Sequence, residues 1–313
     1  MKFTINISKF VIIFLTYTLA LTGVQAAPSV RLNERVPTAG ALEWTYRWAI
    51  KGPEASFVYE KERLWIVGTD TRRKIKIVNQ IRIWQGITVE NFAQVNWLND
   101  IEITPLINLK FKKLSINKPL PIDGINCNGT SFYLSGLIKR ISYVGLSELN
   151  YYLDNQCEQI SSPVPNAIGV IERRTDLYHS FKVIGPDVIF EKESFESKAP
   201  FKFQIMRGYK NPDKNPEFFK CKPAREICAH KYQDLKQEVE RLDVIYSKIF
   251  KSNRLDELIK TAYSEIELLA DKVHVAIDTD AAYPYCEPDL MRLKYRLESL
   301  EEIGRVLKYS GRL

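Results

Sequence analysis

The chain has 313 residues, of which 45% are hydrophobic, so it is long enough to bury a full core and to form more than one domain. This composition excludes a wholly disordered protein. Its 45 Lys and Arg against 38 Asp and Glu residues give a formal net charge of only +7, with both signs mixed along the chain, so we expect no nucleic acid as a partner.

The N-terminus has the pattern of a secretory signal peptide. Lys2 and Lys9 precede or flank an apolar run over residues 10–21, and Val24-Gln25-Ala26 supplies small residues where a signal peptidase reads the chain. The apolar run is shorter than a membrane-spanning helix requires, which favours cleavage over an uncleaved anchor. We therefore expect residues 1–26 to be removed and the protein to be exported, to the periplasm or outside the cell.

Residues 27–118 follow as a predicted β-rich module. β-branched and aromatic residues alternate with polar ones in short runs, which is the period of a strand with one buried face. A helical spacing occurs only around residues 41–50. The four runs with the strand pattern are Ser56–Tyr59, Leu64–Val67, Lys74–Val78 and Leu106–Phe111.

The first candidate catalytic residue along the chain is a cysteine at the start of a predicted helix. Cys127 is followed by Phe132, Leu134 and Leu137 among small residues, so we expect a helix to begin within a residue or two of the cysteine. A helix N-terminus favours the thiolate and lowers the pKa of the thiol. Cys127 is therefore a candidate nucleophile.

A histidine and a carboxylate follow on a predicted hairpin. After a strand over residues 168–171, His179 opens a strand that runs into a Gly-Pro-Asp turn, and residues 188–192 return as the next strand. This geometry brings Glu191 back toward His179, with Glu193 as the alternative. A thiolate nucleophile needs a base and a group that orients the base, and these residue types supply both.

At these residues the chain resembles the NlpC-type cell-wall peptidases, a papain-like family. That family shows Asp-Cys-Ser-Gly at a helix start, a Pro-Gly-Asp-Leu turn and strand, His at the head of the next strand, and a third polar residue about a dozen positions later. The counterparts here are Asn126-Cys127-Asn128-Gly129, Pro165-Asn166-Ala167-Ile168, His179 and Glu191. The resemblance covers roughly residues 119–206.

The resemblance implies a cysteine peptidase or amidase with a papain-like catalytic domain over residues 119–220. Cys127 would attack an amide and form an acyl-enzyme, His179 would act as general base and then acid, and Glu191 would orient His179. The family's usual substrates are the peptide stems of peptidoglycan, so peptidoglycan or a peptide is the expected substrate. No cofactor and no metal are expected, and the sequence contains no Cys-X-X-Cys motif.

Residues 221–313 change to a pattern of long charged helices. Apolar residues recur at three- and four-residue steps, which predicts three amphipathic helices in an antiparallel bundle. We interpret His230 and His274 on these helices as solvated residues. The apolar positions are Leu235, Val239, Leu242, Ile245 and Ile249, then Leu255, Leu258, Ala262, Ile266, Leu269 and Val273, and finally Leu290, Leu293, Leu297, Leu300, Ile303 and Leu307.

The number of cysteines is consistent with two disulfides and one free thiol. In an exported protein, Cys157, Cys221, Cys228 and Cys286 are able to form two disulfides, which leaves Cys127 as the odd thiol. Pairing of Cys221 or Cys228 with Cys286 would join the start of the first terminal helix to the start of the last. The alternative is that all five cysteines are reduced and simply packed.

Together these patterns predict an α+β protein with a β-rich module, a papain-like catalytic domain and a C-terminal helical bundle. The favoured function is an exported cysteine hydrolase. The alternative is a catalytically inactive secreted protein that uses the papain-like domain as a scaffold and the C-terminal helices to bind a protein partner. A third reading keeps the chemistry but changes the substrate, as in another amidase or a transferase.

Overall fold

The structure is a computed structural model of the chain. The predicted signal peptide and the helical spacing at residues 41–50 lie outside the residues that the structure describes. The described residues are 28–35, 55–120, 123–173, 178–206, 215–222, 228, 230–249, 256–279 and 286–309.

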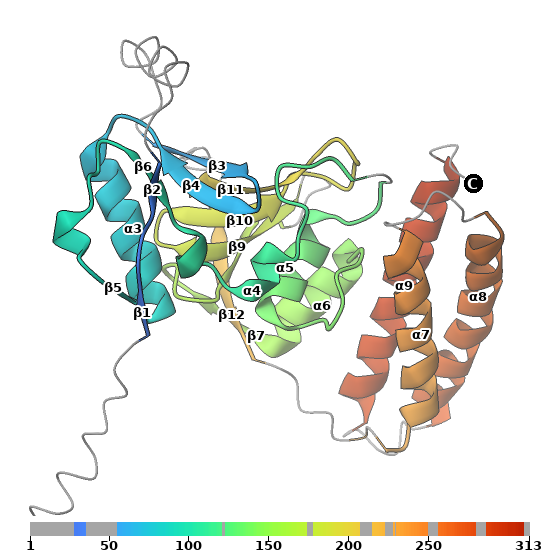
Figure 1. The fold of residues 1–313 in the computed structure, drawn as a ribbon. Helices are drawn as coiled ribbons and strands as arrows, with labels where there is room; N and C mark the ends of the chain where they lie inside the picture. Colours follow the sequence, from blue (N-terminus) through green and yellow to red (C-terminus); the bar gives the residue numbers. More distant parts are fainter. Residues whose placement is uncertain are drawn as a thin grey trace, which may run out of the picture.

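A six-stranded antiparallel sheet forms the centre of the molecule, with strand order β11-β10-β9-β8-β12-β7 (Figure 1). The predicted strands at residues 168–171, 179–185 and 188–192 are confirmed as three neighbouring strands of this sheet. The six strands are β7 (Cys157–Ile160), β8 (Ile168–Ile171), β9 (His179–Gly185), β10 (Val188–Lys192), β11 (Phe201–Ile205) and β12 (Glu217–Cys221).

A second sheet has the order β2-β6-β4-β3, and β1 pairs with β5 in a parallel ribbon. The runs Ser56–Tyr59 and Leu64–Val67 form the hairpin β3–β4 of this sheet, as predicted. The strands are β1 (Ser29–Val30), β2 (Glu34–Arg35), β3 (Ser56–Glu60), β4 (Arg63–Val67), β5 (Thr88–Val89) and β6 (Asp100–Glu102).

The strand prediction for Lys74–Val78 is wrong, because this run lies inside helix α3 (Thr71–Gln85). Ile77 and Ile81, four residues apart, are fully buried on one face of the helix. Their helical spacing decides the structure, although β-branched residues also alternate with polar ones here. Asp70 caps the helix, and Gly86 ends it in the left-handed conformation.

The strand prediction for Leu106–Phe111 is also wrong. Leu106 ends a 3₁₀ turn, η2 (Thr104–Leu106), and Phe111 lies in the short helix α4 (Leu109–Lys112). The Asn108 side chain accepts a hydrogen bond from the N–H of Lys110, which favours helix initiation over continued strand. The β-rich module is therefore a mixed α and β region in its described part. Another 3₁₀ turn, η1 (Phe92–Gln94), lies earlier in the same region, before η2.

Two helices flank the candidate site. Helix α5 (Cys127–Ser135) packs against strands β8, β9 and β10, and α6 (Leu146–Gln156) packs against β7 and β12. Figure 1 shows both helices on the same side of the six-stranded sheet. The prediction that a helix begins at or just after Cys127 is confirmed.

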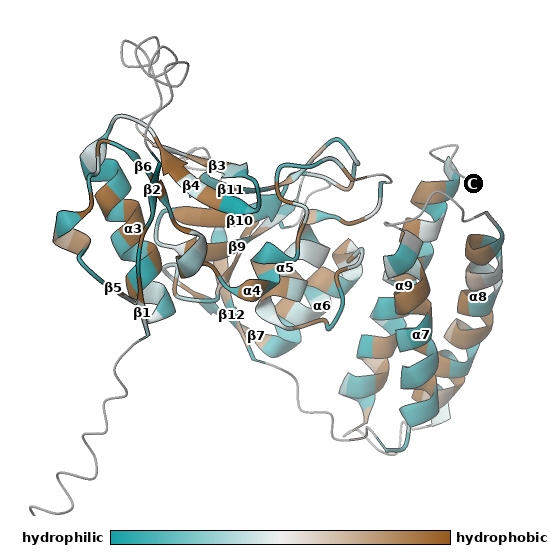
Figure 2. Cartoon of the chain, viewed as in Figure 1, coloured by the Kyte–Doolittle hydropathy of each residue, from teal (hydrophilic) through white to brown (hydrophobic). Residues whose placement is uncertain are grey.

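The three predicted terminal helices are confirmed as α7 (Gln233–Ile249), α8 (Asp256–Thr279) and α9 (Glu287–Tyr309), which pack side by side (Figure 1). Each presents both hydrophobic and hydrophilic residues (Figure 2). The prediction that Leu258 is part of the buried face is wrong, because Leu258 is exposed and its neighbour Ile259 is buried instead. His230 and His274 are exposed, as expected. None of the described helices is both long enough and apolar enough to cross a membrane.

One hydrophobic cluster connects the main parts of the fold. It contains Ile66 of β4, Ile77 of α3, Phe190 of β10 and Leu300 of α9, all completely buried. The chain is therefore of the α+β class, and its helices and sheets share packing surfaces rather than forming isolated modules.

Two disulfides are present, and Cys127 is a free, buried thiol. Cys157 pairs with Cys221 across the neighbouring strands β7 and β12. Cys228, which lies ahead of α7, pairs with Cys286, which lies at the start of α9. The second pairing was one of the two that the helical arrangement predicted. Structural disulfides persist in oxidising compartments, so they indicate an environment outside the cytosol.

Candidate active site

The sequence starts helix α5 at Cys127 by means of a polar cap. Asn126 has an extended backbone, and its side-chain oxygen accepts a hydrogen bond of 2.9 Å from the N–H of Gly129. This is the usual N-cap arrangement, and it places Cys127 at the first helical position. The thiol is therefore held where the partial positive charge of the helix N-terminus favours a thiolate.

A loop crosses the helix closely above this start. A Cβ atom added at Gly129 would lie 1.6 Å from the carbonyl oxygen of Ser142, so only glycine lets the loop approach. Val144 of the same loop accepts a hydrogen bond from the Asn126 side chain at 2.7 Å and one from the Asn128 side chain at 3.1 Å. Both sequence neighbours of Cys127 are thus bound to one backbone carbonyl.

His179 and Glu191 meet as the hairpin predicts. His179 is the first residue of β9, and its Nε2 lies 2.6 Å from Oε2 of Glu191 on β10. The Glu191 side chain is completely buried and also accepts a hydrogen bond from Gln204. Glu193, the alternative, is 58% exposed and binds Lys202 instead. The structure therefore brings Glu191, and not Glu193, to His179.

His179 lies close enough to the Cys127 thiol for each group to shift the pKa of the other. Burial alone raises the pKa of Cys127, but the hydrogen bond and positive charge of His179, helped by backbone contacts of Ser180 and Asn128, bring that pKa below its usual value. Because Nε2 of His179 faces Glu191, Nδ1 is the ring nitrogen that remains for a proton exchange with the thiol.

The pKa of His179 shifts in the opposite direction. Burial lowers it, but the hydrogen bonds and negative charges of Cys127 and Glu191 outweigh burial and raise the pKa to about 10. The lowered pKa of the Cys127 thiol and the raised pKa of His179 both favour the thiolate–imidazolium form of the pair. In this form the pair would have the two groups that thiolate catalysis requires, a nucleophile and a proton donor.

Sequence reasoning missed the polar residues around the thiol. The Asn128 side-chain oxygen accepts a hydrogen bond from the Ser180 hydroxyl at 2.8 Å and lies 3.6 Å from Sγ of Cys127. Burial, and after it the charge of Cys127, raises the pKa of the Tyr178 hydroxyl, whereas hydrogen bonding with Tyr143 and Asn128 acts in the opposite direction. Asn128 and Tyr178 adjoin Cys127 and His179 in sequence, and that adjacency is the one signal that points to them.

The terminal helix α9 reaches the loop beside the thiol. The Tyr143 hydroxyl donates a 2.6 Å hydrogen bond to Glu302, and the N–H of Gly145 donates a 2.9 Å hydrogen bond to the Ser299 hydroxyl. Arg296 donates to the Tyr143 carbonyl at 2.7 Å. No sequence spacing signals these contacts, because they join residues more than 150 positions apart.

Arg296 is the centre of a buried ionic cluster. Its guanidinium binds Glu148 of α6 at 2.8 Å, Asp243 of α7 at 3.0 Å and the Ser142 hydroxyl at 2.5 Å. Burial would lower the pKa of Arg296, but Glu148 and Asp243 raise it, so the group stays charged. Burial raises the pKa of Glu148 to about 7 despite Arg296. The cluster fixes α6, α7, α9 and the loop at Ser142 to one another.

The predicted nucleophile, base and orienting carboxylate therefore meet in one place, and the four other cysteines form disulfides elsewhere. Within the described part of the chain, no three His, Cys, Asp or Glu side chains are grouped so as to hold a metal ion. No protein-family model, no curated protein and no solved structure matches this chain.

Proposed function

We propose that this protein is an exported cysteine hydrolase that cleaves an amide bond through an acyl-enzyme, with the peptide stems of peptidoglycan as substrate. The observation that carries the proposal is His179 held between the Cys127 thiol and the buried carboxylate of Glu191. The papain-like character of the region and the substrate class come from the resemblance to NlpC-type peptidases. The two disulfides support export.

In the first half of the reaction, the Cys127 thiolate attacks the carbonyl carbon of the amide. Negative charge moves to the carbonyl oxygen, where the backbone N–H of Cys127 stabilises it, because the first N–H groups of a helix have no partner within the helix. His179, as imidazolium, gives its proton to the leaving nitrogen. The carbon–nitrogen bond breaks, the amine departs, and a thioester remains on Cys127.

In the second half, neutral His179 removes a proton from a water molecule, and the resulting hydroxide attacks the thioester. The carbon–sulfur bond breaks, the acid product leaves, and the thiolate–imidazolium pair is restored. Glu191 keeps the imidazole ring in one orientation and one tautomer throughout, since its carboxylate binds Nε2.

The first test is the rate at which Cys127 in the disulfide-bonded protein reacts with iodoacetamide from about pH 4 to pH 9. We expect a thiolate that titrates well below the ordinary cysteine pKa. His179→Ala removes the charge that offsets burial, so the rate at about pH 6 should fall at least about 100-fold. A rate indifferent to His179 would contradict the proposal.

The second test is turnover. Purified peptidoglycan is incubated with the protein, and newly released amino groups are identified by mass spectrometry. Cys127→Ala should abolish release, while circular dichroism reports that the fold is retained. If Cys127 is reactive but no amino groups are released from peptidoglycan, the proposed hydrolase chemistry stands and peptidoglycan is excluded as the substrate.

A second candidate function is a secreted, catalytically inactive interaction protein. The observation that favours it is the burial of Cys127, which exposes only 6% of its surface. The alkylation experiment separates the two functions, because an inert packed thiol reacts slowly at every pH and does not depend on His179.

A further inference from the structure

Asn128, the second residue of helix α5, is completely buried beside Cys127 and has no part in the reaction steps proposed above. Its side-chain nitrogen donates a 3.1 Å hydrogen bond to the carbonyl of Val144, in the loop before α6. Its side-chain oxygen accepts a 2.8 Å hydrogen bond from the hydroxyl of Ser180 on β9. One side chain therefore joins a helix, a loop and a strand that come from different parts of the fold.

The two hydrogen bonds determine which way the Asn128 amide faces. A backbone carbonyl only accepts hydrogen bonds, so the amide nitrogen must face Val144. The amide oxygen then faces Ser180, whose hydroxyl is able to donate to it. Both ends of the side chain are thus used, and neither is able to turn without the loss of a hydrogen bond.

The hydrogen bond between Ser180 and Asn128 joins the two halves of the candidate site. Ser180 directly follows His179 in β9, and Asn128 directly follows Cys127 in α5. The bond therefore connects the immediate neighbours of the candidate base and of the candidate nucleophile. Because the base belongs to the sheet and the nucleophile to the helix, their separation depends on how these two elements are held together.

This connection is shielded from water. Asn128 and Ser180 are completely buried, and so is Ser131 of α5, whose hydroxyl oxygen lies 3.1 Å from that of Ser180. A hydrogen bond that is kept from water is electrostatically stronger than one at the surface, and a buried polar group that loses its partner costs free energy. The connection consequently resists any movement that would draw the start of α5 away from β9.

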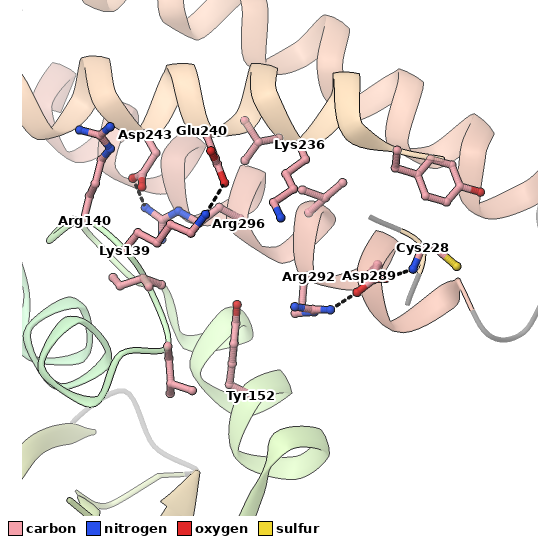
Figure 3. Close-up of a pocket in the computed structure, with 15 residues that line it drawn as sticks. Lys139, Arg140, Tyr152, Cys228, Lys236, Glu240, Asp243, Asp289, Arg292 and Arg296 are labelled. Atoms are coloured by element: carbon pink, nitrogen blue, oxygen red, sulfur yellow. Dashed lines mark hydrogen bonds and ion pairs between the residues drawn. The ribbon is translucent and has the colours of Figure 1, made fainter. Parts of the chain in front are cut away.

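The other partner of Asn128 is held in place by the C-terminal helices. Arg296 of α9 donates a 2.7 Å hydrogen bond to the carbonyl of Tyr143, the residue before Val144. Figure 3 shows Arg296 paired with Asp243 of α7. Asn128 is therefore attached on one side to the central sheet and on the other side to a loop that the terminal helices fix.

We propose that Asn128 is a positioning residue, which holds the Cys127 thiol at the start of α5 within reach of His179 on β9. It acts through its hydrogen bonds to Ser180 and Val144 and affects the reaction through the separation of thiol and imidazole. This inference rests on the proposed function, because the thiol and the histidine are those of the cysteine hydrolase. Attraction between the two groups weakens with distance, so a looser connection disfavours the thiolate.

The test is alkylation of Cys127 by iodoacetamide in Ser180→Ala, which removes only the hydroxyl that binds Asn128. With the thiolate less favoured, the rate at about pH 6 should fall about fivefold, while the rate at about pH 9, where most thiols are ionised, should change less than about twofold. A merely structural effect that alters access to the thiol changes both rates by the same factor. The ratio of the two rates is therefore the readout.

Thr130→Val is the matched control. Thr130 is equally buried on α5, but its hydroxyl binds the carbonyl of Asn126 and does not bind Asn128. Its ratio of rates should equal that of the unmodified chain, and an equal change in this variant and in Ser180→Ala would overturn the proposal. All the variants retain the other titratable groups that interact with the thiol through charge, which are Tyr143, Tyr178 and Lys192.

A pair of variants tests whether Ser180 acts through Asn128. Asn128→Ala should lower the ratio at least as much as Ser180→Ala, and Ser180→Ala should have no further effect when it is added to Asn128→Ala. Additive effects of the two changes would overturn the proposal. Thermal unfolding of each variant shows whether it is folded, and if Asn128→Ala does not fold, the ratio in Ser180→Ala decides alone.

His179→Ala separates this inference from the proposed function. If the alkylation rate does not depend on His179, the cysteine hydrolase is contradicted and the positioning role is contradicted with it. If His179→Ala slows alkylation but Ser180→Ala leaves the ratio of rates unchanged, only the positioning role of Asn128 is overturned.

Discussion

The hairpin around His179 and the cluster around Arg296 both bury charged groups, but they are built in different ways. The hairpin cluster joins residues 12 positions apart in sequence, and it holds a histidine that lowers the pKa of a neighbouring thiol. The Arg296 cluster joins segments 148 and 53 positions away, and its arginine stays protonated. In the proposed function the first cluster would supply a proton, whereas the second cluster holds segments of the fold in place.

The residues around the thiol and the residues that hold the neighbouring loop in place are therefore positioned by different kinds of contact. Local pairing of β9 with β10 sets the distance between His179 and Glu191, whereas contacts from α9 hold the loop at Tyr143 that binds both neighbours of Cys127. A variant of the hairpin cluster should therefore alter thiol chemistry, and a variant of the Arg296 cluster should alter stability first.

The largest effect should come from Arg296→Met. Loss of the guanidinium leaves Glu148 and Asp243 without their shared partner, and breaking a buried ion pair on one side costs about 3–5 kcal/mol. Arg305→Met on the same helix is the control, because Arg305 is 57% exposed and its pair with Glu301 contributes at most about 1 kcal/mol. The free energy of unfolding in urea measures both losses, and equal losses would contradict a supporting role of the Arg296 cluster.

Gly129→Ala should give the next largest effect. In an open helix the change would stabilise by up to about 1 kcal/mol, but here the new Cβ meets the Ser142 carbonyl, and we expect a net loss of about 2 kcal/mol. Alkylation of Cys127 should slow as the loop shifts.

Gly86→Ala is the comparison for Gly129→Ala. Gly86 has a left-handed backbone and open space around its Cα, so this variant should lose only about 1 kcal/mol without any change in thiol reactivity. A Gly129→Ala variant as stable as the unmodified chain would contradict the close approach of the loop.

Glu191→Gln should affect chemistry more than stability. The amide still fills the site, but the negative charge that helps to raise the pKa of His179 is gone, so the thiolate is less favoured and the alkylation rate at about pH 6 should fall about tenfold. Glu193→Gln is the matched control two residues away. If both variants reacted alike, the choice of Glu191 over Glu193 would be wrong.

A separate expectation, which needs no change in sequence, is the pH dependence of stability that comes from His179. Its pKa in the folded chain is about 10, above the ordinary histidine value, so its protonation stabilises the folded state fully below about pH 6.5 and progressively less as the pH rises toward 10. The difference in unfolding free energy between the unmodified chain and His179→Gln should shrink over that interval. A difference that is constant with pH would mean that the pKa of His179 is not raised.

The candidate site could be predicted from sequence to the extent that its parts are local. A cap residue, a helix start and a hairpin are set by neighbours, so Cys127, His179 and Glu191 were accessible to pattern reasoning. Helix α3 was not, because its β-branched residues satisfy a strand period and a helix period over the same few positions, and tertiary burial of Ile77 decided between them.

The surroundings of the site were not accessible in this way. Arg296, Ser299 and Glu302 read as ordinary polar residues of an amphipathic helix, and nothing in their spacing points to a loop that lies more than 150 residues earlier. Folding of the intervening sheet creates that neighbourhood, so three-dimensional contacts and not local propensity determine it.

The long sequence separation between Tyr143 and α9 has a consequence for the order of synthesis. A ribosome finishes Cys127 and its loop well before it finishes Arg296, and domains fold from the N-terminal side as the chain emerges. The growing chain therefore carries Cys127 for many seconds without the helix that fixes the loop beside it. The loop reaches its final position only when the last helix is complete. A nascent chain interrupted before α9 therefore contains Cys127 and His179 but not their final arrangement.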